Sequence, residues 1–422
     1  MLASIASLRE ALEVHRRGIR ETLGFAAAAL ATLAASFALV AASFEWGHIA
    51  SSFLAAAIGG GLLGLSGFLR SKGLALASYV WLGVVLVEAV GFDADHFYSD
   101  ATTRSVGGLS VIAAAIGIHG GAYTHRMAER DWRAGGVLAG VAAVIAAPWA
   151  SLGIGAVSGF NLTALGLGLL VLAALYATLA ARVFRRNGFR DYATVLWSLG
   201  LLLLIGSESA LVHDSVWRAA TIALTGAAIA LLARPLRETR LWLAGIGVVA
   251  VTTLITVLAI TPPDHFFRAS QSPASGLVAL VGCVAAFGAV AWSAQADRQL
   301  VLAAVTGGLG LYALSLGILD VAEHVSTASV ATDFQRGHTA VSALWALVGL
   351  GLLIVGLMRG STSLRYGGLV LFGLSLAKIF LYDLSELSSV ARAFSFILVG
   401  GLLLAGGFFL QRLSDRLGPR HP

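Results

Sequence analysis

The chain alternates along its whole length between long apolar runs and short polar turns. A helix rises 1.5 Å per residue, so each run is long enough to cross about 30 Å of hydrocarbon. Lone strands cannot satisfy their backbone in lipid, and the runs are far longer than the strands of a barrel. The pattern predicts an all-α fold, a polytopic transmembrane helical bundle. About fourteen spans are expected, at residues 24–44, 49–69, 74–91, 106–124, 134–152, 162–181, 192–211, 217–233, 241–260, 276–294, 300–319, 338–357, 366–382 and 391–410.

The basic residues indicate how these spans are oriented. One set of alternate turns and the two ends of the chain hold 22 of the 28 Lys and Arg residues. The opposite set of turns holds five, namely Arg104, Arg218, Arg268, Arg336 and Arg392, and Lys378 lies within a span. Turns rich in Lys and Arg stay in the cytoplasm. Both termini are therefore expected to be cytoplasmic, which requires an even number of spans and agrees with fourteen.

The two ends of the chain are short. Leu2, Ile5, Leu8 and Leu12 recur at helical spacing among arginines, which predicts that residues 1–23 form a short amphipathic cytoplasmic segment on the membrane surface. A cleaved signal peptide fits less well, because the apolar run that follows is of full spanning length. Residues 24–410 are expected to form the transmembrane bundle and residues 411–422 a cytoplasmic tail.

An acidic residue recurs in the turns that alternate with the Arg-rich turns. One such residue closes the first helix of successive predicted hairpins, at Glu88, Glu208, Asp264, Glu323 and Glu386. Their spacings are 120, 56, 59 and 63 residues, and the first is about two units because the intervening turn, near Ser151 to Asn161, lacks a charge. These spacings suggest a helical hairpin of about 60 residues, repeated as in internally duplicated transporters.

Composition supports the membrane assignment. The chain is 58% hydrophobic and 12% charged, whereas soluble domains average about 45–50% and about 25%. The net charge of +6 does not indicate a nucleic-acid partner, because the charges lie in short turns and form no basic stripe. No phosphate-binding loop, dinucleotide fingerprint or nucleophile elbow is present, so no cofactor is expected. The expected partners are the lipid bilayer and other membrane proteins, with the substrate unknown.

Ionisable residues within spans are the first functional candidates. Glu88 and Glu208 occupy matching places, each about one turn from the acidic-turn end of its helix. Either could be a protonatable carboxylate of a coupling pathway. The favoured interpretation is a carboxylate at the membrane interface, where charge is cheaper, reached by water or paired with Arg104 or Arg218.

A charged rim surrounds the last predicted turn, with Lys378, Asp383 and Arg392 as its members. Lys378 is close enough to the end of its span for its stem to carry the ammonium to the interface, and this snorkelling is favoured. The alternative is a polar site in which Lys378 pairs with Asp383, Glu386 or a carboxylate of another helix.

Acidic residues and histidines are neighbours in several acidic turns. Carboxylate and imidazole are ligands of divalent metals such as zinc. No spacing fixes two ligands on one helical face, so solvated polar turns are favoured and the presence of a metal is left open. The candidates are Asp93, Asp95 and His96, then His213 and Asp214, then Asp264 and His265, then Glu323 and His324.

The segment Phe92–His96 also invites comparison with membrane-embedded glycosyltransferases, which use an acidic residue in an outer loop against a lipid-linked sugar. Those enzymes place this residue in their first outer loop and have larger outer loops. Here Asp93 and Asp95 lie in the second predicted outer loop, and the loops are short.

Residues 335–413 resemble a bacterial family of predicted multipass membrane proteins of unknown function. The resemblance implies that Lys378, Asp383 and Arg392 matter, and it implies no established activity. The segments that carry it are Gly337–Leu347 (GHTAVSALWAL), Leu364–Gly368 (LRYGG), Ala377–Ser385 (AKIFLYDLS), Ala391–Phe396 (ARAFSF) and the GLLL run that leads to Gln411 and Arg412.

These observations favour an integral protein of the bacterial inner (cytoplasmic) membrane that takes part in envelope-associated transport or lipid handling. A glycosyltransferase-like enzyme acting on a lipid-linked substrate and a structural or scaffold protein are the alternatives, and a non-enzymatic role is favoured over an enzymatic one. Transport requires a water-accessible cavity lined by Glu88, Glu208 or Lys378. The enzyme requires Asp93 and Asp95 to face a lipid-sized groove, and a scaffold requires neither.

Overall fold

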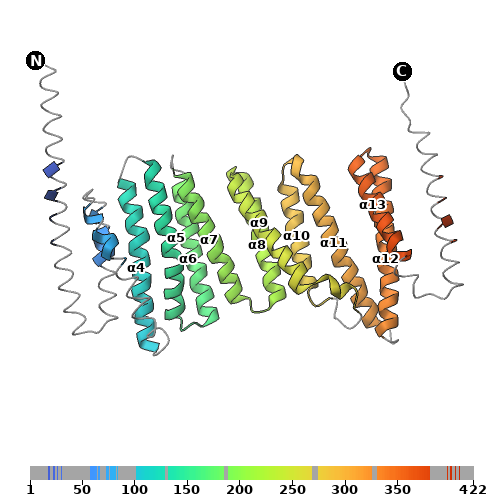
Figure 1. Ribbon diagram of the computed structural model, residues 1–422, viewed down its shortest axis with the longest axis horizontal. Coiled ribbons are helices and arrows are strands. Elements are labelled where there is room, and N and C mark those ends of the chain that lie inside the picture. The colour runs from blue at the N-terminus through green and yellow to red at the C-terminus, as the bar shows by residue number, and fades with distance from the viewer. Residues whose placement is uncertain are drawn as a thin grey trace, which may run out of the picture. The chain divides into compact units, whose positions relative to one another are not determined.

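A computed structural model describes residues 101–128, 132–184, 189–268, 274–325 and 330–380, together with isolated helical residues within 18–30, 58–83 and 397–408. Every element in these described residues is helical, and none is a strand. The all-α prediction is confirmed. Figure 1 shows the helices, whose bounds are α4 (Ala101–Ala128), α5 (Trp132–Val157), α6 (Leu162–Phe184), α7 (Arg190–Leu211), α8 (Ser215–Leu236), α9 (Thr239–Ile255), η1 (Thr256–Ile260, π-helical), η2 (Pro263–Phe266, 3-10), α10 (Leu277–Ser293), α11 (Ala296–Val325), α12 (Val330–Met358) and α13 (Thr362–Lys378).

The ten predicted spans from 106–124 to 366–382 each coincide with one of these α-helices, with η1 continuing α9. Within the described residues, seven helices are long and apolar enough to cross a membrane: Ala139–Val157, Leu162–Phe184, Arg190–Leu211, Ser215–Leu236, Thr239–Ile260, Arg298–Val325 and Thr332–Met358. Two shorter apolar helices are Gly107–Tyr123 and Leu277–Ser293. The predicted spans 24–44, 49–69, 74–91 and 391–410, and the segments 1–23 and 411–422, lie outside the continuously described residues.

The ends of two predicted spans need correction. The predicted spans 300–319 and 338–357 leave a long polar turn between them, but α11 continues to Val325 and α12 begins at Val330. Helical hydrogen bonds satisfy the backbone whether the side chains are apolar or charged. A hydropathy pattern is interrupted at charged residues, so it places the end of α11 several residues too early and the start of α12 several residues too late. Glu323, Asp333 and Arg336 therefore lie on helices.

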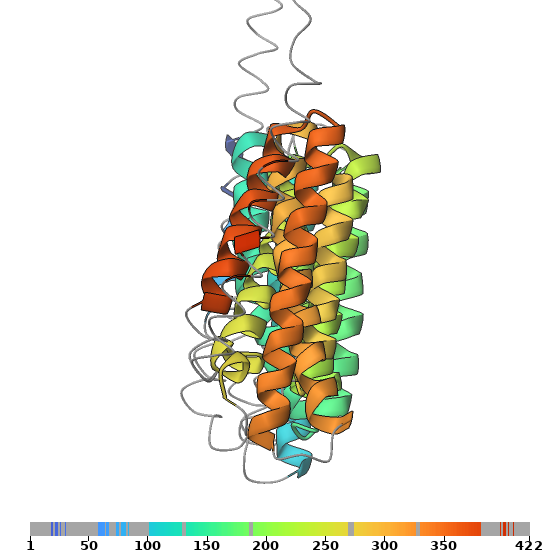
Figure 2. The same ribbon diagram turned by 90° about the vertical axis from the view of Figure 1, so that its right-hand side faces the viewer.

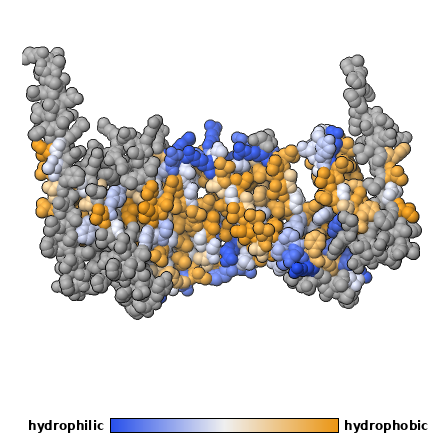
Figure 3. All heavy atoms as spheres, viewed as in Figure 1, coloured by the Kyte–Doolittle hydropathy of each residue, from blue (hydrophilic) through white to orange (hydrophobic). Residues whose placement is uncertain are grey.

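The described helices carry a lipid-facing surface. Large apolar side chains such as Val171, Leu202 and Leu347 are exposed along them. Figure 3 shows the visible side of these helices as apolar along the middle and hydrophilic towards the ends. Soluble proteins rarely expose contiguous apolar surfaces beyond a few hundred Å², so this surface is suited to hydrocarbon.

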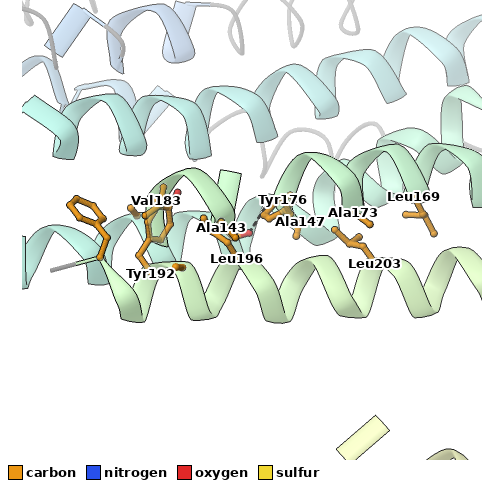
Figure 4. Packing of buried hydrophobic residues seen from close by; sticks show 13 residues of the cluster. Ala143, Ala147, Leu169, Ala173, Tyr176, Val183, Tyr192, Leu196 and Leu203 are labelled. Atoms are coloured by element: carbon orange, nitrogen blue, oxygen red, sulfur yellow. Dashed lines mark hydrogen bonds between the residues drawn. The ribbon is translucent and has the colours of Figure 1, made fainter. Parts of the chain in front are cut away.

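The chain divides into two compact units, and each is described by itself. Unit 1 comprises Met1–Ile222 and Ala228–Gly245, and unit 2 comprises Ala223–Ala227 and Ile246–Pro422. In unit 1, α4 packs against α5, α6 packs against α7, and α5 also contacts α7. Figure 4 shows the core between α5, α6 and α7, where Tyr176, Tyr192 and Leu196 pack beside the alanines of α5. The alanines allow the helices to approach closely enough for Tyr176 Oη to donate to Ala143 O over 3.4 Å.

Small residues set the distance between the paired helices of unit 1. A Cβ built on Gly108 of α4 would lie 2.7 Å from the carbonyl oxygen of Gly153 of α5, and a Cβ on Gly153 would lie 2.7 Å from the Gly108 oxygen. Lipid gives no hydrophobic drive for helix association, so close van der Waals packing and interhelical hydrogen bonds must supply it. In the α6–α7 pair, Ser207 Oγ donates to Gly166 O over 2.8 Å.

We expect Ser207→Ala to lower the free energy of unfolding by about 0.6 kcal/mol, the average for an interhelical hydrogen bond in a membrane protein. The matched control is Ser209→Ala, because the exposed Ser209 Oγ bonds Ile205 O of its own helix. Thermal unfolding of the purified protein in detergent measures both changes. Equal effects of the two substitutions would contradict the role given to the Ser207 hydrogen bond.

Unit 2 is a run of consecutive packed helices. α10 packs on α11, α11 on α12, and α12 on α13. Its core contains Leu280, Leu316, Leu319 and Val341, with Phe266 of η2 inserted beside them. Figure 2 shows α12 and α13, in orange to red-orange, running side by side.

The packing in both units differs from the predicted hairpin, in which an acidic turn joins the two helices. The most extensively packed pairs are α4–α5, α6–α7 and α12–α13. The segment that joins each pair contains arginine, with Arg130 in the first, Arg186 in the second and Arg359 in the third. Among the pairs joined by the opposite set of turns, α5 contacts α6 far less than it contacts α4, whereas α11 and α12 do pack. The composition of a turn indicates the side of the membrane on which it is expected, and it carries no information about which neighbour a helix packs against.

Candidate functional site

Several polar side chains of unit 2 lie along the first half of α12. His338, Ser342 and Trp345 recur at spacings of four and three residues, which places them on one face of the helix. These residues belong to the segment that carries the family resemblance. His338 and Ser342 are buried, with 1% and 2% of their surface exposed. A buried polar row needs hydrogen-bond partners from neighbouring helices.

α13 supplies partners for this row. Lys378 Nζ donates to Ser342 Oγ over 2.6 Å and to His338 O over 3.1 Å. Ser342 Oγ in turn lies 3.0 Å from His338 O, and the buried Ser375 Oγ donates to Ser342 O over 2.9 Å. Lys378 is half-buried and directs its ammonium towards α12. The two interpretations of Lys378 from the sequence are snorkelling to the interface and pairing with a carboxylate, and neither includes this contact with α12.

A lysine beside a serine hydroxyl can activate the serine as a nucleophile in some hydrolases. Such chemistry needs a hydroxyl that a substrate can reach. Ser342 is 2% exposed and packed between α12 and α13, so its role here is to accept a charged hydrogen bond. The arrangement fixes the register and separation of the two helices.

Aromatic side chains enclose the other side of His338. The centroid of its ring lies 5.0 Å from that of Phe266 and 4.5 Å from that of Phe334. Phe266 also stacks on Trp345, and Trp345 Nε1 donates to Ser315 Oγ of α11 over 2.9 Å. The turn that contains Asp264 and His265 is thus anchored to α12 through Phe266.

A different face of α12 borders an apolar groove with a volume of about 670 Å³. Its walls come from the first turns of α10, from the second half of α11 and from α12, with small residues such as Gly317 and Gly337 in the lining. Asp333 and Arg336 also line it. Asp333 is buried, and Arg336 Nη1 lies 3.5 Å from its Oδ1 while 67% of the arginine side chain stays exposed. The groove therefore combines apolar walls with an exposed guanidinium.

The acidic residues that adjoin histidines in the sequence make contacts within a few residues of themselves, where the structure describes them. Asp214 caps α8 by accepting from the backbone N–H groups of Val216 and Trp217 at 2.9 and 3.0 Å, which leaves its neighbour His213 in the preceding turn. Asp264 Oδ2 lies 3.6 Å from Arg268 Nη1. Within the described residues, no three His, Cys, Asp or Glu side chains are placed to hold a metal ion.

The remaining predicted site residues fall into two groups. Glu208 lies on α7, one turn before the end of that helix, and is partly exposed. Glu323 and His324 lie on the last turn of α11, where His324 Nδ1 is 2.8 Å from Asp320 O. The others lie outside the described residues: Glu88, Asp93, Asp95, His96, Asp383 and Arg392.

Lys378 is the member of this region that the sequence marks as a candidate. In the sequence Arg336 is only one of five basic residues in the turns opposite the Arg-rich ones, and no motif marks Asp333 or Ser375. Two spacings in the sequence indicate the contact between α12 and α13. His338 and Ser342 are four residues apart and Ser375 and Lys378 three apart, so each pair shares a helical face. Facing polar pairs in two consecutive apolar helices indicate a shared interface.

Comparison with known proteins gives a family and nothing more specific. No curated protein and no solved structure shows significant similarity to the chain. A family model described as a predicted membrane protein (DUF2339) matches residues 1–413, far beyond the C-terminal region in which the resemblance was first seen. The lipid-facing helices and this match agree, and the chain belongs to the DUF2339 family of predicted membrane proteins.

Proposed function

We propose that this integral membrane protein handles lipid, and that the groove of unit 2 holds an anionic amphiphile. The observation that carries the proposal is the exposed guanidinium of Arg336 at an apolar groove of about 670 Å³. Ligand sites commonly have volumes of about 300–1,000 Å³, apolar walls and few polar groups. The walls suit an acyl chain, and Arg336 suits a phosphate or carboxylate.

The Lys378 cluster supports this site from the opposite face of α12. Its hydrogen bonds hold α12 against α13, while Gly337 lies close to α11 on the other side. A Cβ on Gly337 would lie 3.0 Å from Leu319 Cδ2. α12 is thus held on both sides, which keeps Arg336 in a fixed position relative to the groove.

Transport of a small ion has less support than lipid handling. It requires a cavity lined by Glu88, Glu208 or Lys378. The groove of unit 2 and a cavity in unit 1 are lined by neither Glu208 nor Lys378. Both spaces have apolar walls, which favour hydrocarbon over a hydrated ion.

The proposal includes the topology expected from the sequence: about fourteen spans, both termini in the cytoplasm and residence in the bacterial inner membrane. It also includes repeated helical hairpins, with the closest packing across the Arg-containing turns and not across the acidic ones. In this topology Arg336 belongs to the outer side, so the groove takes lipid from the outer leaflet. The partners are the bilayer and other membrane proteins, without nucleic acid and without a cofactor.

We expect Gly317→Leu to reduce the lipid that co-purifies with the protein by about fivefold, equivalent to roughly 1 kcal/mol. The new side chain would fill the groove, since a Cβ on Gly317 has only Leu277 Cδ2 nearby, at 3.8 Å. Native mass spectrometry of the full chain in mild detergent, with phosphatidylglycerol added, counts the bound lipids. Gly307→Leu is the matched control on α11, because nothing lies within 4 Å of a Cβ there.

Arg336→Gln separates headgroup recognition from filling of the groove. It is expected to weaken phosphatidylglycerol binding while leaving phosphatidylcholine binding unchanged. If Gly317→Leu and Arg336→Gln both retain the lipid of the unchanged protein, the groove is not a lipid site and a scaffold role takes its place. An outer-loop glycosyltransferase would instead lose activity on Asp93→Asn and keep its bound lipid.

A further inference from the structure

Unit 1 contains a cavity that the proposed function does not use. Its volume is about 330 Å³, and it lies between the α6–α7 pair and the segment Ile229–Ala244, which includes the end of α8 and the start of α9. Leu170, Leu201, Leu204 and Leu232 are among the apolar residues that line it. An empty apolar space forfeits the contacts of its lining, so hydrocarbon is the filling that this cavity favours.

One end of the cavity is polar. Arg240 and Thr194 line it there, and Arg240 Nη1 donates to Asp191 Oδ1 over 2.6 Å and to Thr194 Oγ1 over 3.2 Å. These bonds attach the start of α9 to the start of α7. Because Arg240 remains more than half exposed, its guanidinium can contact a further group.

A second arginine, Arg190, does not line the cavity but contacts a residue that does. The guanidinium of Arg190 lies 5.7 Å from the centroid of the Phe184 ring, and Phe184 lines the cavity. The net charge around this end of the cavity is positive, because the exposed arginines outnumber the acidic residues Asp191 and Glu238. The exposed arginines of the helix ends on this side are Arg182, Arg190, Arg234, Arg237 and Arg240.

We propose that this cavity binds one acyl chain of an anionic phospholipid, whose phosphate lies between Arg190 and Arg240. Basic pockets between membrane helices on the cytoplasmic side are suited to anionic headgroups, and the Arg-rich ends of these helices belong to that side in the proposed topology. The lipid joins the α6–α7 pair to the start of α9 in the space that protein side chains leave open. This site shares no residue with the groove of unit 2, so either can fail without the other.

The test uses the full chain in mild detergent with equimolar phosphatidylglycerol and phosphatidylcholine, and native mass spectrometry counts each lipid. The double variant Arg190→Gln/Arg240→Gln is expected to reduce the preference for phosphatidylglycerol by about tenfold, equivalent to about 1.4 kcal/mol. Arg359→Gln, an exposed arginine of unit 2, is the charge-matched control and should leave the preference unchanged. An unchanged preference in the double variant overturns the proposal.

A second measurement tests the acyl chain and guards against misfolding. Trp197 lines the cavity, so phosphatidylglycerol with brominated chains should quench its fluorescence, and Trp197→Phe should remove that part of the quenching. Ala177→Phe fills the cavity and should abolish the Trp197 quenching. Ala164→Phe, on an exposed alanine of α6 away from the cavity, should preserve it. Quenching that persists in Ala177→Phe while the protein elutes as the unchanged protein does would overturn the proposal.

Discussion

Gly368→Leu is expected to lower the free energy of unfolding by about 3 kcal/mol, at the upper end of the usual cost of overpacking. A Cβ on Gly368 would lie 2.5 Å from Leu353 N and 2.7 Å from Gly349 O. These atoms belong to the backbone of α12 and cannot move aside as a side chain can. The leucine must therefore separate α12 from α13, and the Lys378 hydrogen bonds are lost with the contact. Thermal unfolding in detergent measures the change.

The neighbouring glycine provides the control. Gly367 is exposed and nothing lies within 4 Å of a Cβ built on it. Leucine there is expected to be neutral or to stabilise by up to about 1 kcal/mol, because glycine is a poor helix former. Similar losses at the two positions would mean that α12 and α13 are not packed as described.

Ser342→Ala is expected to cost about 2 kcal/mol, more than the double variant Ser342→Ala/Lys378→Met costs. The single change removes the acceptor at 2.6 Å from Lys378 Nζ and leaves a half-buried ammonium with fewer bonds. Losing one partner of a charged hydrogen bond leaves the other to carry its desolvation cost, whereas replacing both by apolar groups can be nearly neutral. Methionine has a similar length to lysine and removes the charge.

A double-mutant cycle measured by thermal unfolding gives the coupling between Ser342 and Lys378. Thr339→Ala on the same helix is the control, because the exposed Thr339 Oγ1 bonds Gln335 O of its own helix. Strict additivity of the two single changes would show that Lys378 is stabilised elsewhere and that its contact with α12 contributes little.

The positions of the helices could be predicted from the sequence because hydrophobic length is a local property. The spans predicted at 162–181 and 192–211 became α6 and α7 with small changes at their ends. The boundary between α11 and α12 could not be predicted in this way. Asp320, Glu323, Asp333 and Arg336 interrupt the apolar pattern there, yet the helical backbone continues through them.

The contents of the candidate site were only partly predictable. The sequence marks Lys378 as an ionisable residue in a span, but its bonds to α12 depend on which helix α13 packs against. That choice follows from Gly349 and Gly368, whose contact becomes visible only in three dimensions. Glycine is frequent along the whole chain, so its presence alone did not mark this interface. The groove at Arg336 likewise depends on how three consecutive helices, α10, α11 and α12, pack together, and their order in the sequence does not give that packing.

The pairing of helices across Arg-containing turns has a consequence for biogenesis. In the proposed topology, α4, α6 and α12 each return towards the cytoplasm before their partners are synthesised. The face of α12 that carries Gly349 therefore stays uncovered in the bilayer until α13 has followed it. We expect a nascent or truncated chain that stops at Arg359 to present Gly349 and Gly356, which α13 otherwise covers, to any other membrane helix. Completion of the hairpin is then expected to protect the protein from mispairing.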